Sequence, residues 1–305
     1  MSAPSILFPR KLRQGDTIGL AAPASPPEQA DKIDEVIARF TACGFRLKLG
    51  RNLRQRTGYL AGSDKERAAD INTLFADRKV DAVFALRGGY GSCRILPLLD
   101  YKMIRANPKP FIGYSDITAM HNAILRKSGL ITFHGSNASS AFETDNAKIC
   151  RKILMEPAAK NGTILFSRET TRSIKTVVAG KISGRLIGGN MTCLLRLLGT
   201  PYAPDFRRVI LFLEDTGEKA YRVDGLFCHL RLAGITEQIG GLILGQFDHP
   251  DPGEEKRVQE VLRHEAKRIG VPAIVGAPIG HFAGQVIIPH GIHAAFDATK
   301  GLLKF

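Results

Sequence analysis

The first half of the chain alternates short apolar runs with segments in which apolar residues recur at helical spacing. Residues 16–23 have the pattern of a buried strand, and residues 28–43 have that of an amphipathic helix. Ser63 and Glu66 are spaced as a capping box, which predicts a helix beginning there. The alternation continues to residue 133, so we predict βαβ units and a mostly parallel sheet covered on both faces.

The apolar pattern weakens between residues 143 and 172, where Pro157 and Gly162 indicate a linker or crossover. Beyond it, strand-like runs are expected at 176–187, 209–213, 239–244 and 274–279, and helices at 191–198, 221–232 and 254–268. We therefore predict an N-terminal α/β domain over 1–150, a linker over 151–174 and a C-terminal α+β domain over 175–305.

A glycine-rich loop, Arg87-Gly88-Gly89-Tyr90-Gly91, follows the apolar strand 80–86. Glycine lets backbone N–H groups approach a substrate closely, which suits an oxyanion hole or an anion cradle. A tight turn between strand and helix requires the same residues. Neither the fingerprint G-x-G-x-x-G nor the P-loop lysine accompanies the loop, so the cradle is the weaker interpretation.

The segment Gly113-Tyr114-Ser115-Asp116 joins the apolar strand 110–114 to a predicted helix over 116–127. A serine in such a turn projects above the carboxyl end of the sheet, and the N–H of the next residue lies at the positive end of the helix. Ser followed by Asp is also an ordinary helix N-cap, and Ile117 stands where the nucleophile elbow has a second glycine. The pattern alone favours capping over a nucleophilic role.

A nucleophilic serine needs a histidine as its base, and the chain has eight histidines. His121 lies about 240° around the predicted helix from Ser115, so we expect it to point elsewhere, into the packing or the surface. His134 ends the neighbouring strand and is placed to overhang the site. His281 follows the strand 273–280 in a turn, which by itself gives it no special role.

A triad also needs a carboxylate to orient the imidazole. Glu214 directly follows the buried strand 209–213 and is the best placed candidate, with Asp215 and Glu218 as rivals. The competing interpretation of all three is helix capping after the strand.

Composition narrows the classes of function. The formal charge of +14 favours anionic partners, but the basic residues are scattered without zinc-finger spacing or an RRM signature, so nucleic-acid binding is not predicted. The five cysteines form no C-x-x-C pair, which indicates neither disulfides nor a zinc site and fits a reducing compartment. No apolar run reaches the roughly 20 residues of a membrane helix, and no signal peptide is recognised. We expect a cytoplasmic protein without membrane contact.

Considered together, several segments resemble the LD-carboxypeptidase family of serine peptidases over essentially the whole chain. The matching segments, in order, are Ile18-Gly19-Leu20-Ala21-Ala22-Pro23, Arg87-Gly88-Gly89-Tyr90-Gly91, Gly113-Tyr114-Ser115-Asp116, Phe133-His134-Gly135, Gly184-Arg185-Leu186-Ile187-Gly188-Gly189-Asn190, Leu211-Phe212-Leu213-Glu214-Asp215, Tyr221-Arg222-Val223-Asp224 and Gly280-His281. The resemblance implies a Rossmann-like or flavodoxin-like N-terminal domain with a parallel sheet, and a smaller C-terminal domain with a barrel-like sheet.

The resemblance also implies roles for individual residues. The catalytic triad falls on Ser115, Glu214 and His281. The oxyanion donors are the backbone N–H groups of Asp116 and of either Gly88 or Gly89. Candidates for substrate binding are Arg185, Asn190 and Tyr90. A structural role is the competing interpretation of Arg185 and Asn190. One departure stands out: Ser136-Asn137 occupies the place where the family pattern has a proline and an apolar residue.

The resemblance implies that the protein removes the terminal D-Ala from murein tetrapeptides during cell-wall recycling, without a metal or cofactor. It also implies a homodimer, which is common in the family. The carboxylates of an anionic muropeptide suit a basic enzyme. Two alternatives stay open. One is a hydrolase of peptidyl-nucleotides that confers immunity to microcin C, which the lack of tryptophan disfavours because nucleobases stack on aromatic side chains. The other is a non-catalytic binding protein for small anions, in which Ser115 only caps a helix.

Overall fold

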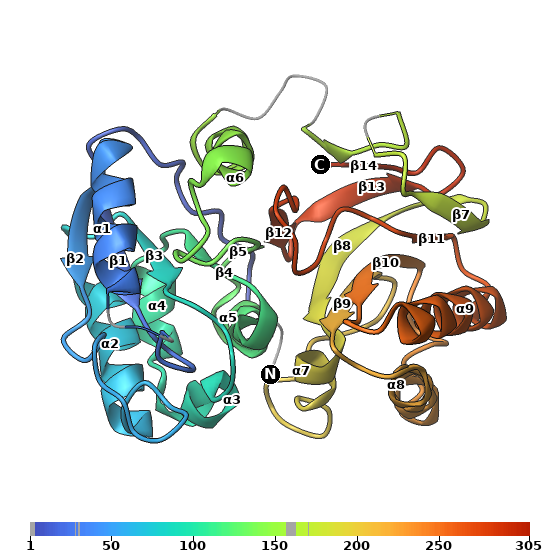
Figure 1. Ribbon diagram of the computed structural model, residues 1–305, viewed down its shortest axis with the longest axis horizontal. Helices are drawn as coiled ribbons and strands as arrows, with labels where there is room; N and C mark the ends of the chain where they lie inside the picture. Colours follow the sequence, from blue (N-terminus) through green and yellow to red (C-terminus); the bar gives the residue numbers. More distant parts are fainter. Residues whose placement is uncertain (1–3, 28, 30, 157–162, 170) are drawn as a thin grey trace. The chain divides into compact units, whose positions relative to one another are not determined.

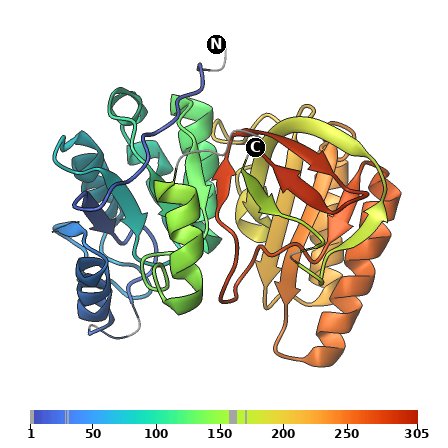
Figure 2. The same cartoon turned by 90° about the horizontal axis from the view of Figure 1, so that it is seen from above.

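The computed structural model describes residues 4–27, 29, 31–156, 163–169 and 171–305. The chain forms two compact units (Figure 1 and Figure 2). Unit 1 consists of residues 1–157 with 199–203, and unit 2 of residues 158–198 with 204–305. Part of the predicted linker, residues 157–162 and 170, lies outside the described residues. Within the described part, no helix has the length and apolar character needed to cross a membrane.

Unit 1 contains the predicted parallel sheet. Its strands are β1 (Thr17–Ala21), β2 (Arg46–Leu49), β3 (Ala82–Ala85), β4 (Phe111–Gly113) and β5 (Thr132–His134). They lie side by side in the order β5-β4-β3-β1-β2, and each neighbouring pair is parallel. All carboxyl ends therefore meet at one edge, which brings the segments after β1, β3 and β4 together.

The helical segments of unit 1 are α1 (Lys32–Ala42), α2 (Asp64–Ala76), α3 (Ser92–Ile95), η1 (Leu96–Leu98), α4 (Tyr101–Ala106), η2 (Ser115–Ile117), α5 (Thr118–Ser128), α6 (Thr144–Cys150) and η3 (Arg151–Met155). Ser63 caps α2 through the predicted capping box with Glu66. The segment predicted as one helix over 116–127 consists of two elements, the short 3₁₀ turn η2 and the helix α5.

Aromatic side chains show how helices cover both faces of this sheet. Val83 and Phe111 are partners in register across β3 and β4, so they share one face, while Phe84 points to the other. Phe75 of α2 contacts Phe111 with ring centroids 6.1 Å apart. Phe40 of α1 contacts Phe84 at 5.2 Å. The predicted two-sided cover is confirmed.

Unit 2 is built on a mixed sheet. Its strands are β6 (Ile164–Phe166), β7 (Lys175–Val178), β8 (Lys181–Asn190), β9 (Ile210–Thr216), β10 (Gly241–Asp248), β11 (Ala273–Val275), β13 (His293–Asp297) and β14 (Leu302–Lys304). The order is β6-β14-β13-β8-β9-β10-β11-β7, with β8 to β11 mutually parallel and the outer pairs antiparallel. Among the described residues this sheet stays open rather than closing into a barrel.

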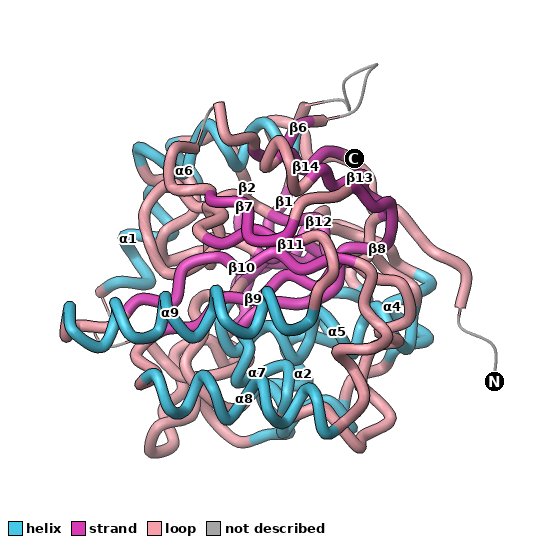
Figure 3. The backbone as a smooth tube through the Cα atoms, turned by 90° about the vertical axis from the view of Figure 1, so that its right-hand side faces the viewer, coloured by secondary structure: helices cyan, strands magenta, loops and turns pink. Residues whose placement is uncertain are grey.

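The remaining elements of unit 2 are α7 (Met191–Leu195), α8 (Ala220–Leu232), α9 (Pro252–Ile269) and the short strand β12 (Ile288–His290), which contacts β8. Helix α9 packs on β10 and β11, and α8 packs on α9 (Figure 3). The apolar side chains of α9 that face this packing include Val258 and Leu262, both fully buried.

Two strand predictions in unit 2 differ from the structure. The run 176–187 is two strands, β7 and β8, because Gly180 has a φ of +143° and turns the chain between them. Strand β9 extends to Thr216, so Glu214 and Asp215 belong to the strand itself and do not cap a helix after it.

Candidate active site

Ser115 stands in the turn between β4 and α5 with a φ of +65°, and it is one of three non-glycine residues with positive φ among those described. The left-handed conformation costs a residue with a Cβ about 1–2 kcal/mol, so it persists only where the surroundings impose it. Tyr114 is the N-cap of η2 and Ile117 that of α5. The capping role that the pattern favoured for Ser115 is therefore wrong, and a strained turn holds its side chain.

The glycine loop lies directly against this serine. A Cβ on Gly88 would lie 2.8 Å from the Cβ of Ser115 and 3.1 Å from its Oγ. Gly89 has a φ of +105°, and a Cβ there would lie 2.5 Å from the Oγ of Ser25. The N–H of Tyr90 donates to that same Oγ at 3.1 Å, which leaves Gly88 and Gly89 as the candidate donors of this loop. Glycine is required here for close backbone approach.

The Asp116 side chain is committed to local structure. Its Oδ2 accepts the N–H of Ser92 at 2.8 Å, and its own backbone carbonyl accepts the Ser92 hydroxyl. Both residues are buried, and together they tie the start of α3 to η2. The candidate oxyanion donor of Asp116 is therefore its backbone N–H.

In unit 2, Glu214 and His281 form a buried pair. The Nδ1 of His281 lies 2.8 Å from Oε2 of Glu214, whose side chain is fully buried while that of His281 is 19% exposed. Burial alone would lower the pKa of His281, but the hydrogen bond and charge of Glu214 outweigh it and raise that pKa above its ordinary value. This is the geometry of a carboxylate that orients an imidazole.

The hydrogen bonds of the three candidate carboxylates show which of them is the partner of His281. Asp215 accepts hydrogen bonds from the Thr192 N–H at 2.9 Å, the Thr192 hydroxyl at 2.8 Å and Nδ2 of Asn190 at 2.8 Å. Glu218 pairs with Arg222 on the surface. Neither rival lies against His281, so Glu214 is the carboxylate of the pair.

The predicted substrate-binding residues lie in different settings. Asn190 is buried at the end of β8, where its Oδ1 accepts the N–H of Cys193 at 3.1 Å and caps α7. Arg185 lies on β8, and its Nη1 donates to the carbonyl of Gly291 at 3.1 Å. Tyr90 is 43% exposed. Burial raises the pKa of the Glu214 carboxyl above its ordinary value, and His281 and Asn190 offset only part of that rise. Asn190 is thus part of the support around Glu214.

Several residues that bear on the site were missed by sequence reasoning. Ser25 follows β1 at the same carboxyl edge as the glycine loop, and the parallel topology could have singled it out. His134 is fully buried in unit 1, and its ring contacts those of Tyr114 and His121. His121 and Asn137 contact the backbone beside Ser115, which no spacing rule indicates.

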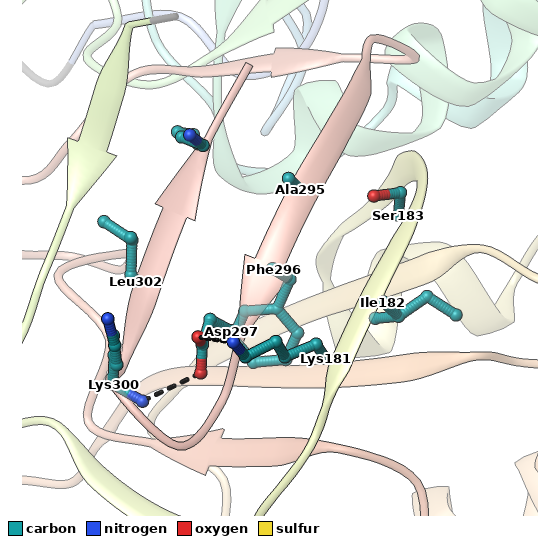
Figure 4. A pocket seen from close by; sticks show the side chains of 9 residues that line it. Lys181, Ile182, Ser183, Ala295, Phe296, Asp297, Lys300 and Leu302 are labelled. Carbon is teal, nitrogen blue, oxygen red and sulfur yellow. Dashed lines mark hydrogen bonds and ion pairs between the residues drawn. The ribbon is translucent and has the colours of Figure 1, made fainter. Parts of the chain in front are cut away.

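A hollow elsewhere in unit 2 has a volume of about 400 Å³ and lies on the sheet face of β8, β13 and β14 (Figure 4). Lys181 and Asp297 form an ion pair of 3.3 Å at its side, and the N–H of Lys300 donates to Asp297 at 3.0 Å. None of the predicted catalytic residues lines it. Within the described residues, no cluster of three or more His, Cys, Asp or Glu side chains is arranged to hold a metal ion.

A strained serine beside a glycine loop, and a buried glutamate–histidine pair, are the components of a serine hydrolase on an α/β scaffold. The chain belongs to the LD-carboxypeptidase family: residues 18–135 match the model of the LD-carboxypeptidase N-terminal domain, and residues 183–296 match that of the C-terminal domain. It is thereby a member of a family of peptidases.

Relatives of the chain fall into two groups by name. A probable murein peptide carboxypeptidase of Bacillus subtilis (strain 168) is 35% identical, over 96% of this chain and 92% of its own. The wild-type apo structure of a Microcin C7 self-immunity protein has a TM-score of 0.88 at 28% identity, covering 98% of both chains. A muramoyltetrapeptide carboxypeptidase from Oxalobacter formigenes has a TM-score of 0.79 at 26% identity, covering 94% and 97%.

Proposed function

We propose that this chain is a serine LD-carboxypeptidase that removes the terminal D-Ala from murein tetrapeptides, with Ser115 as nucleophile, His281 as base and Glu214 as its orienting carboxylate. The observation that carries the proposal is the 2.8 Å contact between Nδ1 of His281 and the buried Oε2 of Glu214. Because the carboxylate holds Nδ1, the Nε2 of the ring is the atom that exchanges a proton with the nucleophile.

In the proposed mechanism, His281 takes the hydroxyl proton of Ser115 as Oγ attacks the carbonyl before D-Ala. The N–H groups of Asp116 and of Gly88 or Gly89 stabilise the oxyanion. His281 then gives its proton to the amine of D-Ala, which leaves, and a water molecule hydrolyses the ester on Ser115. The chemistry requires Ser115 to come within hydrogen-bond reach of Nε2 in the working enzyme.

The choice of substrate rests on charge and on relatives. A murein tetrapeptide carries several carboxylates, and the chain has a formal charge of +14 that attracts such a ligand. By sequence, the 35% identity to a protein named for murein peptides exceeds the 29% identity to the Microcin C7 self-immunity protein of Escherichia coli. We therefore place murein peptides ahead of peptidyl-nucleotides as the substrate class.

The test is mass-spectrometric detection of D-Ala released from muropeptide tetrapeptide by the purified protein. Wild type should release D-Ala and Ser115→Ala should not, while Ser183→Ala, at an exposed serine in unit 2, should match wild type. If the protein cleaves a peptidyl-nucleotide and not the tetrapeptide, the proposed substrate class is wrong and the proposed mechanism still stands. Release by Ser115→Ala would contradict the mechanism.

We further propose that the protein works in the cytoplasm and as a homodimer. The compartment rests on five cysteines that form no C-x-x-C pair, and the dimer on the family resemblance. Cell fractionation and sedimentation equilibrium test the two statements separately. Recovery in an extracytoplasmic fraction, or a monomer at micromolar concentration, would contradict them.

A further inference from the structure

The peptide unit that precedes Tyr114 is bonded from both sides by buried side chains. Nε2 of His121 lies 2.8 Å from the carbonyl oxygen of Gly113, and Oδ1 of Asn137 accepts the N–H of Tyr114 at 3.1 Å. The carbonyl and the N–H belong to the same peptide plane. We propose that His121 and Asn137 are positioning residues that fix this plane and thereby aim Ser115. The inference rests on the proposed role of Ser115 as nucleophile.

The hydrogen bonds of His121 define its tautomer. Because a carbonyl only accepts, Nε2 carries the ring proton that bonds Gly113, and Nδ1 accepts the hydroxyl of Thr132 at 2.8 Å. The side chain is fully buried, and burial lowers its pKa to about 4. The ring is therefore neutral in the working range of most enzymes and acts as a fixed donor. The prediction that it points away from Ser115 misses this contact with the backbone.

Asn137 is held as firmly as the peptide it bonds. Asn137 is buried, and its backbone carbonyl accepts the N–H groups of Ser140 at 3.0 Å and Ala141 at 2.7 Å. A Cβ on Gly113 would lie 3.0 Å from Oδ1 of Asn137, so the amide fits tightly against the strand end. An apolar residue at position 137 has no acceptor for the Tyr114 N–H.

The two contacts bear on the strain at Ser115. A residue at φ +65° stays there only if neighbouring dihedral angles are held, and the fixed plane lies immediately before Tyr114. A loosened plane lets the serine relax and moves Oγ. Because a displacement of about 1 Å in a catalytic group costs on the order of 100-fold in rate, small relaxations are measurable. Substrate binding by other residues is left intact.

The experiment compares variants of the full chain. His121→Phe removes the imidazole donor at similar size and leaves the Gly135 N–H, which also donates to the Gly113 carbonyl at 3.0 Å. His121→Gln restores an N–H near the position of Nε2, and Asn137→Leu removes the acceptor at similar volume. The measurements are kcat and KM for the tetrapeptide, the melting temperature, and the rate at which a fluorophosphonate phosphonylates Ser115. In that reaction Oγ bonds phosphorus, fluoride leaves and His281 takes the proton.

We expect His121→Phe and Asn137→Leu to lower kcat and the phosphonylation rate together by about 10- to 100-fold, with KM nearly unchanged. His121→Gln should recover most of the loss. The matched control is Ser128→Ala on the same helix, because this buried hydroxyl donates to the Ile124 carbonyl at 2.6 Å. It should lower the melting temperature and leave kcat at the wild-type value.

The proposal is overturned if His121→Phe and Asn137→Leu lose only thermal stability and keep wild-type kcat and phosphonylation rate, or if His121→Gln is no better than His121→Phe. If the Phe and Leu variants do not fold, Thr132→Val decides, because it removes only the hydroxyl that holds Nδ1 of His121 and with it the orientation of the ring. A fall in kcat for this variant supports the proposal, and an unchanged kcat overturns it. A wild type whose Ser115 is not labelled would instead refute the proposed function.

Discussion

Replacing Gly88 by alanine adds one methyl group directly against the proposed nucleophile. The new Cβ would lie 2.8 Å from the Cβ of Ser115, 3.1 Å from its Oγ and 3.2 Å from the carbonyl oxygen of Tyr114. The first two are side-chain atoms of a strained residue, and the third is backbone. Unlike Gly89, Gly88 is not in the positive-φ region, so the effect of the substitution is steric.

The size of the effect follows from these distances. Carbon atoms in contact lie about 3.5–4.0 Å apart, so a contact of 2.8 Å must open by roughly 0.7–1.2 Å. Overpacking of this kind costs about 1–3 kcal/mol of stability. If the strain is relieved by moving Ser115, a shift of about 1 Å lowers kcat by on the order of 100-fold.

The assay is D-Ala release by Gly88→Ala, with the free energy of unfolding measured by urea denaturation. Gly225→Ala is the matched control, since a Cβ there meets nothing within 4 Å and the site lies in helix α8. It should keep full activity and gain about 1 kcal/mol of helix stability. Wild-type kcat in Gly88→Ala would refute the placement of this loop against a catalytic Ser115.

Other parts of the site give further predictions. Because Glu214 raises the pKa of His281, the acid limb of the pH profile of kcat/KM should lie above pH 6.5. Glu214→Gln should shift this limb to lower pH and reduce kcat by at least about 100-fold. A limb that does not move would contradict the proposed pairing of Glu214 with His281. Asn190→Ala should lower the free energy of unfolding by about 1.5–3 kcal/mol in urea titrations, because it removes a bond to a buried carboxylate. Tyr90→Ala should raise KM at constant kcat, and the exposed control Tyr221→Ala should change neither.

Much of the arrangement of unit 1 follows from the sequence. Alternating strands and helices require a parallel sheet, and a parallel sheet brings the loop after β3 and the turn after β4 to the same edge. The proximity of Gly88 and Ser115 is a consequence of topology. The close fit between them depends on φ angles and side-chain positions, which no periodicity contains.

The roles of buried polar residues could not be predicted in the same way. The helical offset of His121 gives its direction relative to Ser115, but its bond is to Gly113 on the preceding strand, a tertiary contact. The family resemblance offers Asn190 for substrate contact, yet the structure buries it beside Asp215. Amide and imidazole groups bond backbone, side chain or ligand equally well, so only the folded structure assigns their partners.

The central claim is that Ser115 forms a covalent intermediate with the acyl part of the substrate. Rapid acid quenching of the wild-type protein with tetrapeptide, followed by proteolysis and mass spectrometry, tests it directly. The account predicts a tripeptide ester on the peptide that contains Ser115, formed as D-Ala is released and absent from Ser115→Ala. Release of D-Ala with that serine unmodified, or an ester on another residue, would contradict it.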